Sequence, residues 1–266
     1  MTKQNPAKLI NWKYTFVYAF LFLINILPLI TEMPYQPQDT QDVIINLLMV
    51  SIIPYKPYGP IFHIVTLLIV FAILRKPGRM GRLMAGYIGI NYLIIAAAQT
   101  IGQTEKYGFV IHLSALMTML ILGITWLVVA FRNDIQPTFK KSTPLEYGLI
   151  ALALLAFWGP YTEINGTIRP HFDPLLLLTS PDYGLTFCFT TPIFLIGLVL
   201  IHPRVNPFAY RITAFSGLLY GLFNLTHWFN PVTQWMGFLH LPLLVISIYA
   251  LILPGFNKRA KIMRHE

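Results

Sequence analysis

Long apolar runs, separated by short polar stretches, dominate the chain. Eight runs are about 16 to 24 residues long, and none alternates apolar and polar residues as a half-buried strand does. An α-helix rises about 1.5 Å per residue, so about 20 apolar residues cross a hydrocarbon core about 30 Å thick. The pattern therefore predicts an all-α, polytopic integral membrane protein.

The runs predict a bundle of eight transmembrane helices within a single transmembrane domain, residues 1–266. Two apolar pieces between the runs, near 40–53 and 173–180, are too short to span and predict interfacial or re-entrant segments on the outer side. Asp173 is expected to cap the second piece, with Pro174 at its first helical position. The predicted spans are 14–31, 59–74, 83–101, 108–131, 146–161, 183–201, 210–228 and 237–254.

Charge predicts the orientation of the bundle. With the N-terminus inside, only Lys56, Lys106 and Arg169 of the 19 basic residues fall on outer segments, and the other 16 fall inside. Cytoplasmic loops of membrane proteins carry such an excess. We therefore expect a multi-pass protein of the cell membrane with both termini cytoplasmic. Lipid headgroups explain the net charge of +9, so no nucleic-acid partner is expected.

A recurring Tyr-Gly pair marks the outer ends of the runs. Pairs at 58–59, 107–108 and 183–184 open three predicted inward-running helices, and WMGFLH (235–240) opens the fourth. The glycine is expected to let an outer loop approach closely. A histidine or cysteine follows each glycine by three or four positions, about one helical turn below the surface. These four residues are His63, His112, Cys188 and His240.

The same four residues form the predicted metal-ligand set. Three imidazoles and a thiolate suit zinc or copper, and a pair of histidines suits a haem iron. Zinc, copper or haem are therefore the candidate cofactors. None of the four belongs to a dense motif such as HExxH or CxxC, so a histidine-lined pocket without metal and separate structural histidines are the alternatives.

Acid–base chemistry needs a carboxylate or imidazole near a reacting group. His227 lies at the outer end of the seventh run, and Glu163 and Asp173 lie in a polar outer loop. Intramembrane ionisable residues usually face the bundle interior. The predicted catalytic set is therefore His63, His112, His227, His240, Glu163 and Asp173.

Three functional hypotheses follow. The first is an enzyme with a histidine-lined polar pocket open to the outer leaflet, acting on a lipid or lipid-linked substrate. The second is a transporter or membrane substrate-binding protein, suggested by Asn25, Asn91 and Pro192 within the runs. The third is a haem-bearing or structural subunit of a membrane complex. Membrane lipids and a lipid-like or small-molecule ligand are the expected partners. A retinal Schiff base is excluded because no predicted span contains lysine.

Overall fold

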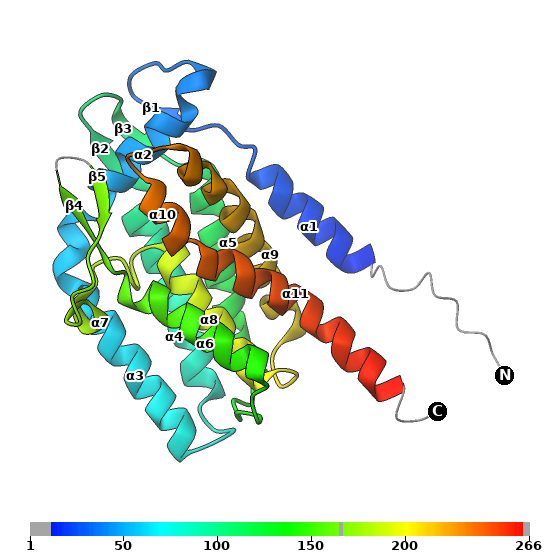
Figure 1. The fold of residues 1–266 in the computed structure, drawn as a ribbon. Coiled ribbons are helices and arrows are strands. Elements are labelled where there is room, and N and C mark those ends of the chain that lie inside the picture. Colours follow the sequence, from blue (N-terminus) through cyan, green and yellow to red (C-terminus); the bar gives the residue numbers. More distant parts are fainter. Residues whose placement is uncertain (1–11, 165–166, 263–266) are drawn as a thin grey trace.

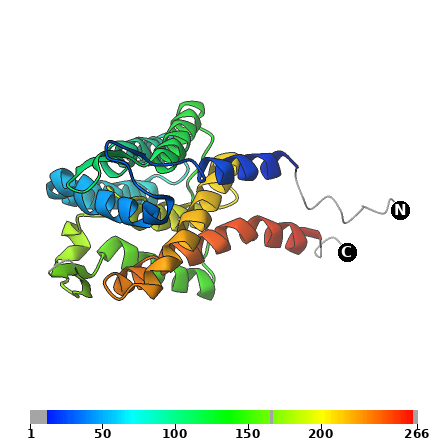
Figure 2. The same cartoon turned by 90° about the horizontal axis from the view of Figure 1, so that it is seen from above.

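Helices form most of the structure, a computed structural model that describes residues 12–164 and 167–262. Eight longer helices make up the bundle, and each overlaps one of the predicted apolar runs (Figure 1). They are α1 (Trp12–Ile24), α3 (Gly59–Arg75), α4 (Gly81–Gln99), α5 (Leu113–Arg132), α6 (Pro144–Trp158), α8 (Phe187–Ile201), α9 (Pro207–Phe223) and α11 (Leu241–Ile262). Seen from above, α1 and α11 both extend beyond the body of the bundle on the same side (Figure 2).

Four helical segments of the described chain are long and apolar enough to cross a membrane. They are Ile53–Arg75, Gly81–Gln99, Leu113–Arg132 and Gln234–Gly255. The helices Tyr14–Ile24, Pro144–Trp158 and Phe187–Ile201 are also apolar but shorter. The structure thus supports an all-α membrane protein with at least four helices suited to span.

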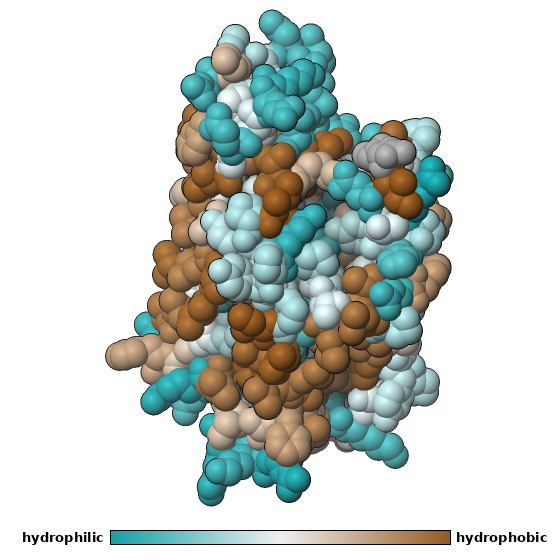
Figure 3. Space-filling view, turned by 90° about the vertical axis from the view of Figure 1, so that its left-hand side faces the viewer, coloured by the Kyte–Doolittle hydropathy of each residue, from teal (hydrophilic) through white to brown (hydrophobic). Residues whose placement is uncertain are grey.

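Helix α3 indicates which medium surrounds the bundle. Its buried side carries the polar residues His63 and Thr66, whereas Ile64, Leu68 and Phe71 on the opposite side are 53%, 60% and 55% exposed. A helix on the surface of a soluble protein shows the reverse arrangement. The surface on the α3 side shows apolar residues along its left edge and across its lower middle, a weakly polar patch at its centre, and hydrophilic residues at the top and bottom (Figure 3). Such a band matches a bilayer.

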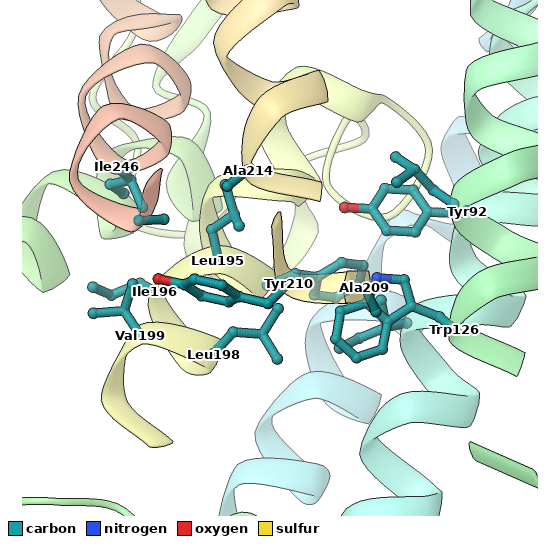
Figure 4. Close-up of a cluster of buried hydrophobic side chains, with 14 of the residues drawn as sticks. Tyr92, Trp126, Leu195, Ile196, Leu198, Val199, Ala209, Tyr210, Ala214 and Ile246 are labelled. Atoms are coloured by element: carbon teal, nitrogen blue, oxygen red, sulfur yellow. The ribbon is translucent and has the colours of Figure 1, made fainter. Parts of the chain in front are cut away.

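Large buried side chains fill the centre of the bundle. Tyr92 of α4, Trp126 of α5 and Tyr210 of α9 pack with aliphatic residues of α8 (Figure 4). The indole of Trp126 donates a hydrogen bond to Thr213 Oγ1 at 2.9 Å. Tyr92 and Thr191 share another, at 3.1 Å. These two hydrogen bonds pair polar groups of different helices, as polar side chains in lipid commonly do.

Glycines allow the closest helix pairs. A Cβ atom on Gly89 of α4 would lie 2.9 Å from the Gly123 carbonyl oxygen of α5. A Cβ on Gly217 would lie 2.3 Å from Ser247 Oγ, and one on Gly221 would lie 2.9 Å from Leu244 Cα. Small residues four apart favour such contacts in membranes. This contact brings the C-terminal end of α9 close to the N-terminal end of α11, and predicted site residues lie at these two ends.

One end of the bundle, called here the strand end, carries two small antiparallel sheets. The first has the order β1–β3–β2, with Gly102 opposite Val110, and the second pairs β4 with β5, with Glu163 opposite Ile168. The strands are β1 (Ile30–Thr31), β2 (Ile101–Thr104), β3 (Gly108–Ile111), β4 (Tyr161–Ile164) and β5 (Thr167–Pro170). The short helices are η2 (Pro37–Asp39), α2 (Thr40–Ser51), η3 (Ile53–Tyr58), α7 (Leu176–Thr179), η4 (Asn224–Phe229) and α10 (Gln234–Leu239).

These strands correct the prediction that runs 14–31, 83–101, 108–131 and 183–201 are helical to their outer ends. Helix α1 ends at Ile24, α4 at Gln99, and helices α5 and α8 begin only at Leu113 and Phe187. The late starts of α5 and α8 are explained by the Tyr-Gly pairs that precede them. Gly108 and Gly184 have φ angles of 65° and 84°, which a right-handed helix does not contain. Those pairs end turns, and only the pair at 58–59 opens a helix.

The two short outer segments are helical where the sequence predicted them. Helix α2 lies within 40–53, and α7 lies within 173–180. Asp173 Oδ1 accepts a hydrogen bond from the backbone nitrogen of Leu175 at 2.9 Å in the turn before α7. Helix α7 begins at Leu176 with Leu175 as its N-cap, so the predicted cap at Asp173, with Pro174 at the first helical position, lies two residues too early. The chain termini, residues 1–11 and 263–266, lie outside the described residues, so their predicted cytoplasmic location is not described here.

Candidate functional site at the strand end

The connection from α9 to α11 brings together two of the predicted site histidines. After α9 ends at Phe223, the chain continues through η4 and α10 before α11 begins. A Cβ atom on Gly237 of α10 would lie only 1.8 Å from Trp228 Cδ1 of η4. The glycine therefore lets η4 and α10 pack directly on each other. His227 lies within η4, and His240 directly follows α10.

His227 and His240 stack, with ring centroids 5.4 Å apart and ring planes inclined by 16°. His227 Nδ1 lies 2.9 Å from Thr233 Oγ1. His240 Nδ1 lies 2.5 Å from the carbonyl oxygen of Met236. A carbonyl oxygen can only accept, so Nδ1 of His240 carries the proton, and Nε2 of the neutral ring is an acceptor.

Asn224, the first residue of η4, links this pair to Cys188. Its amide nitrogen donates to the Tyr220 carbonyl oxygen at 2.7 Å and to Cys188 Sγ at 3.3 Å. Because the Tyr220 carbonyl can only accept, the amide orientation is fixed and Oδ1 is the free acceptor. No described residue donates a hydrogen bond to this oxygen.

A narrow crevice, which leaves no room for a water molecule, lies between α9, η4, α10 and α11. It is lined by Gly221, Asn224, Leu225, Gly237, His240, Leu241 and Leu244. Its surroundings are apolar, because Leu222 of α9, Phe238 of α10 and Val245 of α11 are 46%, 43% and 38% exposed. Two hydrogen-bond acceptors are thus set into an otherwise apolar surface between α9 and α11.

Phe189 of α8 joins this cluster to a buried carboxyl group. The Phe189 ring centroid is 6.0 Å from that of His240 and 6.1 Å from that of Tyr161. The Tyr161 hydroxyl donates to Asp182 Oδ2 at 2.6 Å. Asp182 is 3% exposed, and its burial raises the pKa of the carboxyl group. The rings of Tyr161 and Phe189 therefore lie between this carboxyl group and the histidine pair.

His63 has a different environment. It is fully buried, its Nε2 lies 3.2 Å from the Ser180 carbonyl oxygen, and its ring centroid lies 4.4 Å and 4.8 Å from those of Phe157 and Tyr183. A Cβ on Gly59 would lie 2.7 Å from the same carbonyl oxygen, so the loop does approach at this glycine. None of these contacts involves another predicted site residue.

The other predicted catalytic residues are held apart from the histidine pair. His112 occupies the position before α5, where its backbone nitrogen donates to the Thr100 carbonyl oxygen at 2.8 Å. Glu163 is exposed on β4, and Asp173 lies in the turn before α7. Within the described chain, no hydrogen bond or ring contact joins these three residues to His227 or His240.

The predicted metal-ligand set is not assembled either. Residues 12–164 and 167–262 hold no group of three or more His, Cys, Asp or Glu placed to bind a metal ion. His63 donates to the Ser180 carbonyl, and the Cys188 thiol accepts from Asn224. The four residues match in their distance from the glycines, but helix rotation and separate packing partners keep them in different environments.

Sequence reasoning missed part of this end of the molecule. The sequence pattern does not point to Asp182, Ser180 or Thr233 as site residues. One signal was present in SPDYGLT (180–186), where proline, glycine and several polar residues interrupt two apolar stretches. The pattern marks a loop, but it does not show that the loop is buried.

Comparison with known proteins supplies no relative. No protein-family model, no curated protein and no solved structure matches the chain at a significant level. The geometry of the strand end is therefore the basis for assigning a function.

Proposed function

We propose that the protein crosses the membrane eight times, with the strand end outside and both termini in the cytoplasm. Each predicted span has a helix, and among the basic residues that the structure describes, the strand end carries only Lys56, Lys106 and Arg169. Helices of 15 residues, such as α6 and α8, are short for a bilayer. Local thinning of the bilayer accommodates such helices.

Cysteine labelling tests this topology. In a Cys188→Ala background, Glu105→Cys at the strand end should react with a membrane-impermeant maleimide added to intact cells. Lys141→Cys, in the loop before α6, should react only after the membrane is opened. Reaction of Lys141→Cys in intact cells would contradict the proposed orientation.

We also propose that the strand end binds a lipid or lipid-like molecule and exchanges a proton with it. The observation that carries this proposal is the stacked pair of His227 and His240 beside a narrow crevice with an apolar rim. His240 Nε2 is the acceptor for the ligand proton, His227 supports the ring by stacking, and Asn224 helps to orient the ligand. A neutral imidazole has one ring nitrogen with a free lone pair, which can accept a proton as a general base.

Retained lipids provide the test of this site. The wild-type protein, purified in mild detergent, should carry a lipid species that native mass spectrometry detects. His240→Phe keeps the ring volume but removes Nε2, so it should lose this species. The matched control is His171→Phe, which changes an exposed histidine of the outer loop. Identical lipid profiles for the three proteins would contradict the proposed site.

A further inference from the structure

The end of the bundle opposite the strand end, called here the basic end, is formed by three connected loops (Figure 1). The backbone nitrogen of Gly78 donates to the Pro137 carbonyl oxygen at 2.9 Å, and that of Gln136 donates to the Arg204 carbonyl oxygen at 3.2 Å. These bonds join the first loop to the second and the second to the third, so the loops form one surface. The loops are 76–80, 133–143 and 202–206.

Basic side chains are exposed on this surface without carboxylates to neutralise them. Among the described residues of the basic end, the only exposed acid is Asp134, which accepts from Asn206 Nδ2 at 3.3 Å. Glu146 is buried and forms an ion pair with Lys140 at 2.8 Å. No ion pair within the described chain involves the exposed basic residues of this end. They are Arg75, Lys76, Arg79, Arg82, Arg132, Lys141 and Arg204.

Two of these arginines, Arg82 and Arg132, lie at the same level on neighbouring helices. Helices α4 and α5 pack together, and a Cβ atom on Gly86 would lie 3.9 Å from Ala130 Cβ. Arg82 precedes Gly86 by about one helical turn, and Arg132 follows Ala130 by two residues. A cation in the first turn of a helix is unfavourably placed relative to the helix dipole, so Arg82 does not stabilise α4 itself.

Apolar side chains adjoin the same arginines. Phe131 is 87% exposed and Leu83 is 51% exposed. On α3, the guanidinium carbon of Arg75 lies 5.0 Å from the ring centroid of Phe71, which is 55% exposed. Basic residues at the ends of membrane helices place their charge at the headgroup level in this way. The charges therefore border the apolar surface at the level of lipid phosphates.

We infer that the basic end binds an anionic phospholipid, with its phosphate group between Arg82 and Arg132 and its acyl chains along Phe131 and Leu83. The inference requires a protein embedded in a bilayer, but it is independent of the histidine site and of which end is cytoplasmic. Guanidinium groups bind phosphate oxygens through paired N–H donors. Each basic group near an anionic membrane surface strengthens binding by about fivefold.

Other ligands match only part of this surface. A soluble anion, such as free phosphate or a nucleic acid, satisfies the arginines but leaves Phe131 and Leu83 in water. A zwitterionic phospholipid covers these apolar residues but carries an ammonium group, which the surrounding positive charges disfavour. An anionic phospholipid supplies both the net negative charge and the apolar chains.

Competitive lipid binding tests this assignment. Protein in mild detergent is mixed with phosphatidylglycerol and phosphatidylcholine of identical acyl chains, and native mass spectrometry measures each bound lipid. The wild type should retain phosphatidylglycerol about fivefold or more better than phosphatidylcholine. Arg82→Gln combined with Arg132→Gln should lower phosphatidylglycerol retention about tenfold. Both side chains are exposed and have no hydrogen bond within the described chain, so this double variant should fold normally.

Two controls locate the site. Lys76→Gln combined with Arg204→Gln removes the same charge from the same end, and it should lower retention by less than about threefold because neither residue contacts the phosphate. His240→Phe, at the strand end, should leave phosphatidylglycerol retention unchanged, which separates this inference from the histidine site.

Three outcomes would overturn the inference. Equal retention of the two lipids by the wild type, or displacement of phosphatidylglycerol by an equal concentration of inorganic phosphate, would contradict an anionic phospholipid as the ligand. An equal loss of retention in the two double variants would contradict the assignment to Arg82 and Arg132.

Discussion

His63 and His240 follow a glycine by about one helical turn, yet their surroundings differ. At His63, the approaching segment is a loop whose Ser180 carbonyl accepts from the ring, and Phe157 and Tyr183 enclose the imidazole. At His240, the approaching segment is η4, which brings His227 and Asn224. In both places the glycine permits the close approach, at Ser180 in one and at Trp228 in the other.

The comparison shows that one sequence pattern serves two purposes. Glycine and a following histidine fix how closely a neighbouring segment packs and how deep the imidazole lies. The neighbouring segment decides the rest. A carbonyl and aromatic rings make His63 a structural residue, whereas a second imidazole and an apolar crevice make His240 a candidate for ligand binding.

The largest expected effect is a loss of stability when the loop that packs against His63 is disrupted. Gly184 has a φ of 84°, and a Cβ there would lie 2.0 Å from Phe62 Cγ, so Gly184→Val combines backbone strain with a steric clash. We expect it to lower the free energy of unfolding by about 3–5 kcal/mol. The matched control is Gly148→Ala in α6, where nothing lies within 4 Å. Denaturant titration in detergent measures both, and equal stability of the two variants would show that the loop is not packed as described.

A smaller effect on the unfolding free energy distinguishes His63 from His240. His63→Ala removes a fully buried ring and its hydrogen bond to Ser180, so we expect a loss of about 2–4 kcal/mol in unfolding free energy. His240→Phe should change stability by less than about 1.5 kcal/mol, because ring volume is preserved. The same denaturant titration tests both. A larger loss for His240→Phe than for His63→Ala would reverse the roles assigned to the two residues.

The smallest effect concerns the pH dependence of the loop beside His63. Burial raises the pKa of Asp182, although Tyr161 and the nearby Lys56 favour its charged form. The folded state therefore keeps this proton after the unfolded chain has lost it. The stabilisation is complete below the unfolded pKa of about 4 and is lost as pH rises through the folded pKa. Asp182→Asn should remove this decline in unfolding curves between pH 4 and 8. Parallel pH profiles for wild type and variant would contradict it.

Much of the fold follows from the sequence, for a simple physical reason. Crossing a bilayer requires long apolar helices, and each predicted run has its helix. The short strands at the strand end were not predictable in the same way. Apolar residues such as those of β3 (Gly108–Ile111) fit a helix or a strand, and the positive φ of Gly108 decides between them.

The sequence predicted a common depth for the site residues, but Gly108, Gly184 and His112 lie outside helices α5 and α8. The spacing from glycine placed His63, His112, Cys188 and His240 at similar distances from the strand end, but rotation about each helix axis depends on packing. The stacking of His227 on His240 depends on η4, a 3₁₀ segment without a strong sequence signal. The buried pair of Tyr161 and Asp182 depends on contacts between segments 21 residues apart.

The most direct measurement compares the reactivity of individual histidines in one sample. Folded protein in nanodiscs is treated with diethyl pyrocarbonate, which modifies neutral imidazole nitrogens, and each histidine is quantified by mass spectrometry with and without hexadecanol, a lipid-like probe. We expect His240 and His227 to react, hexadecanol to slow both, and His63 to remain unmodified until the protein is unfolded. Equal reactivity of His63 and His240 in the folded protein, or no protection of His240 by hexadecanol, would contradict the division between a structural and a ligand-binding histidine.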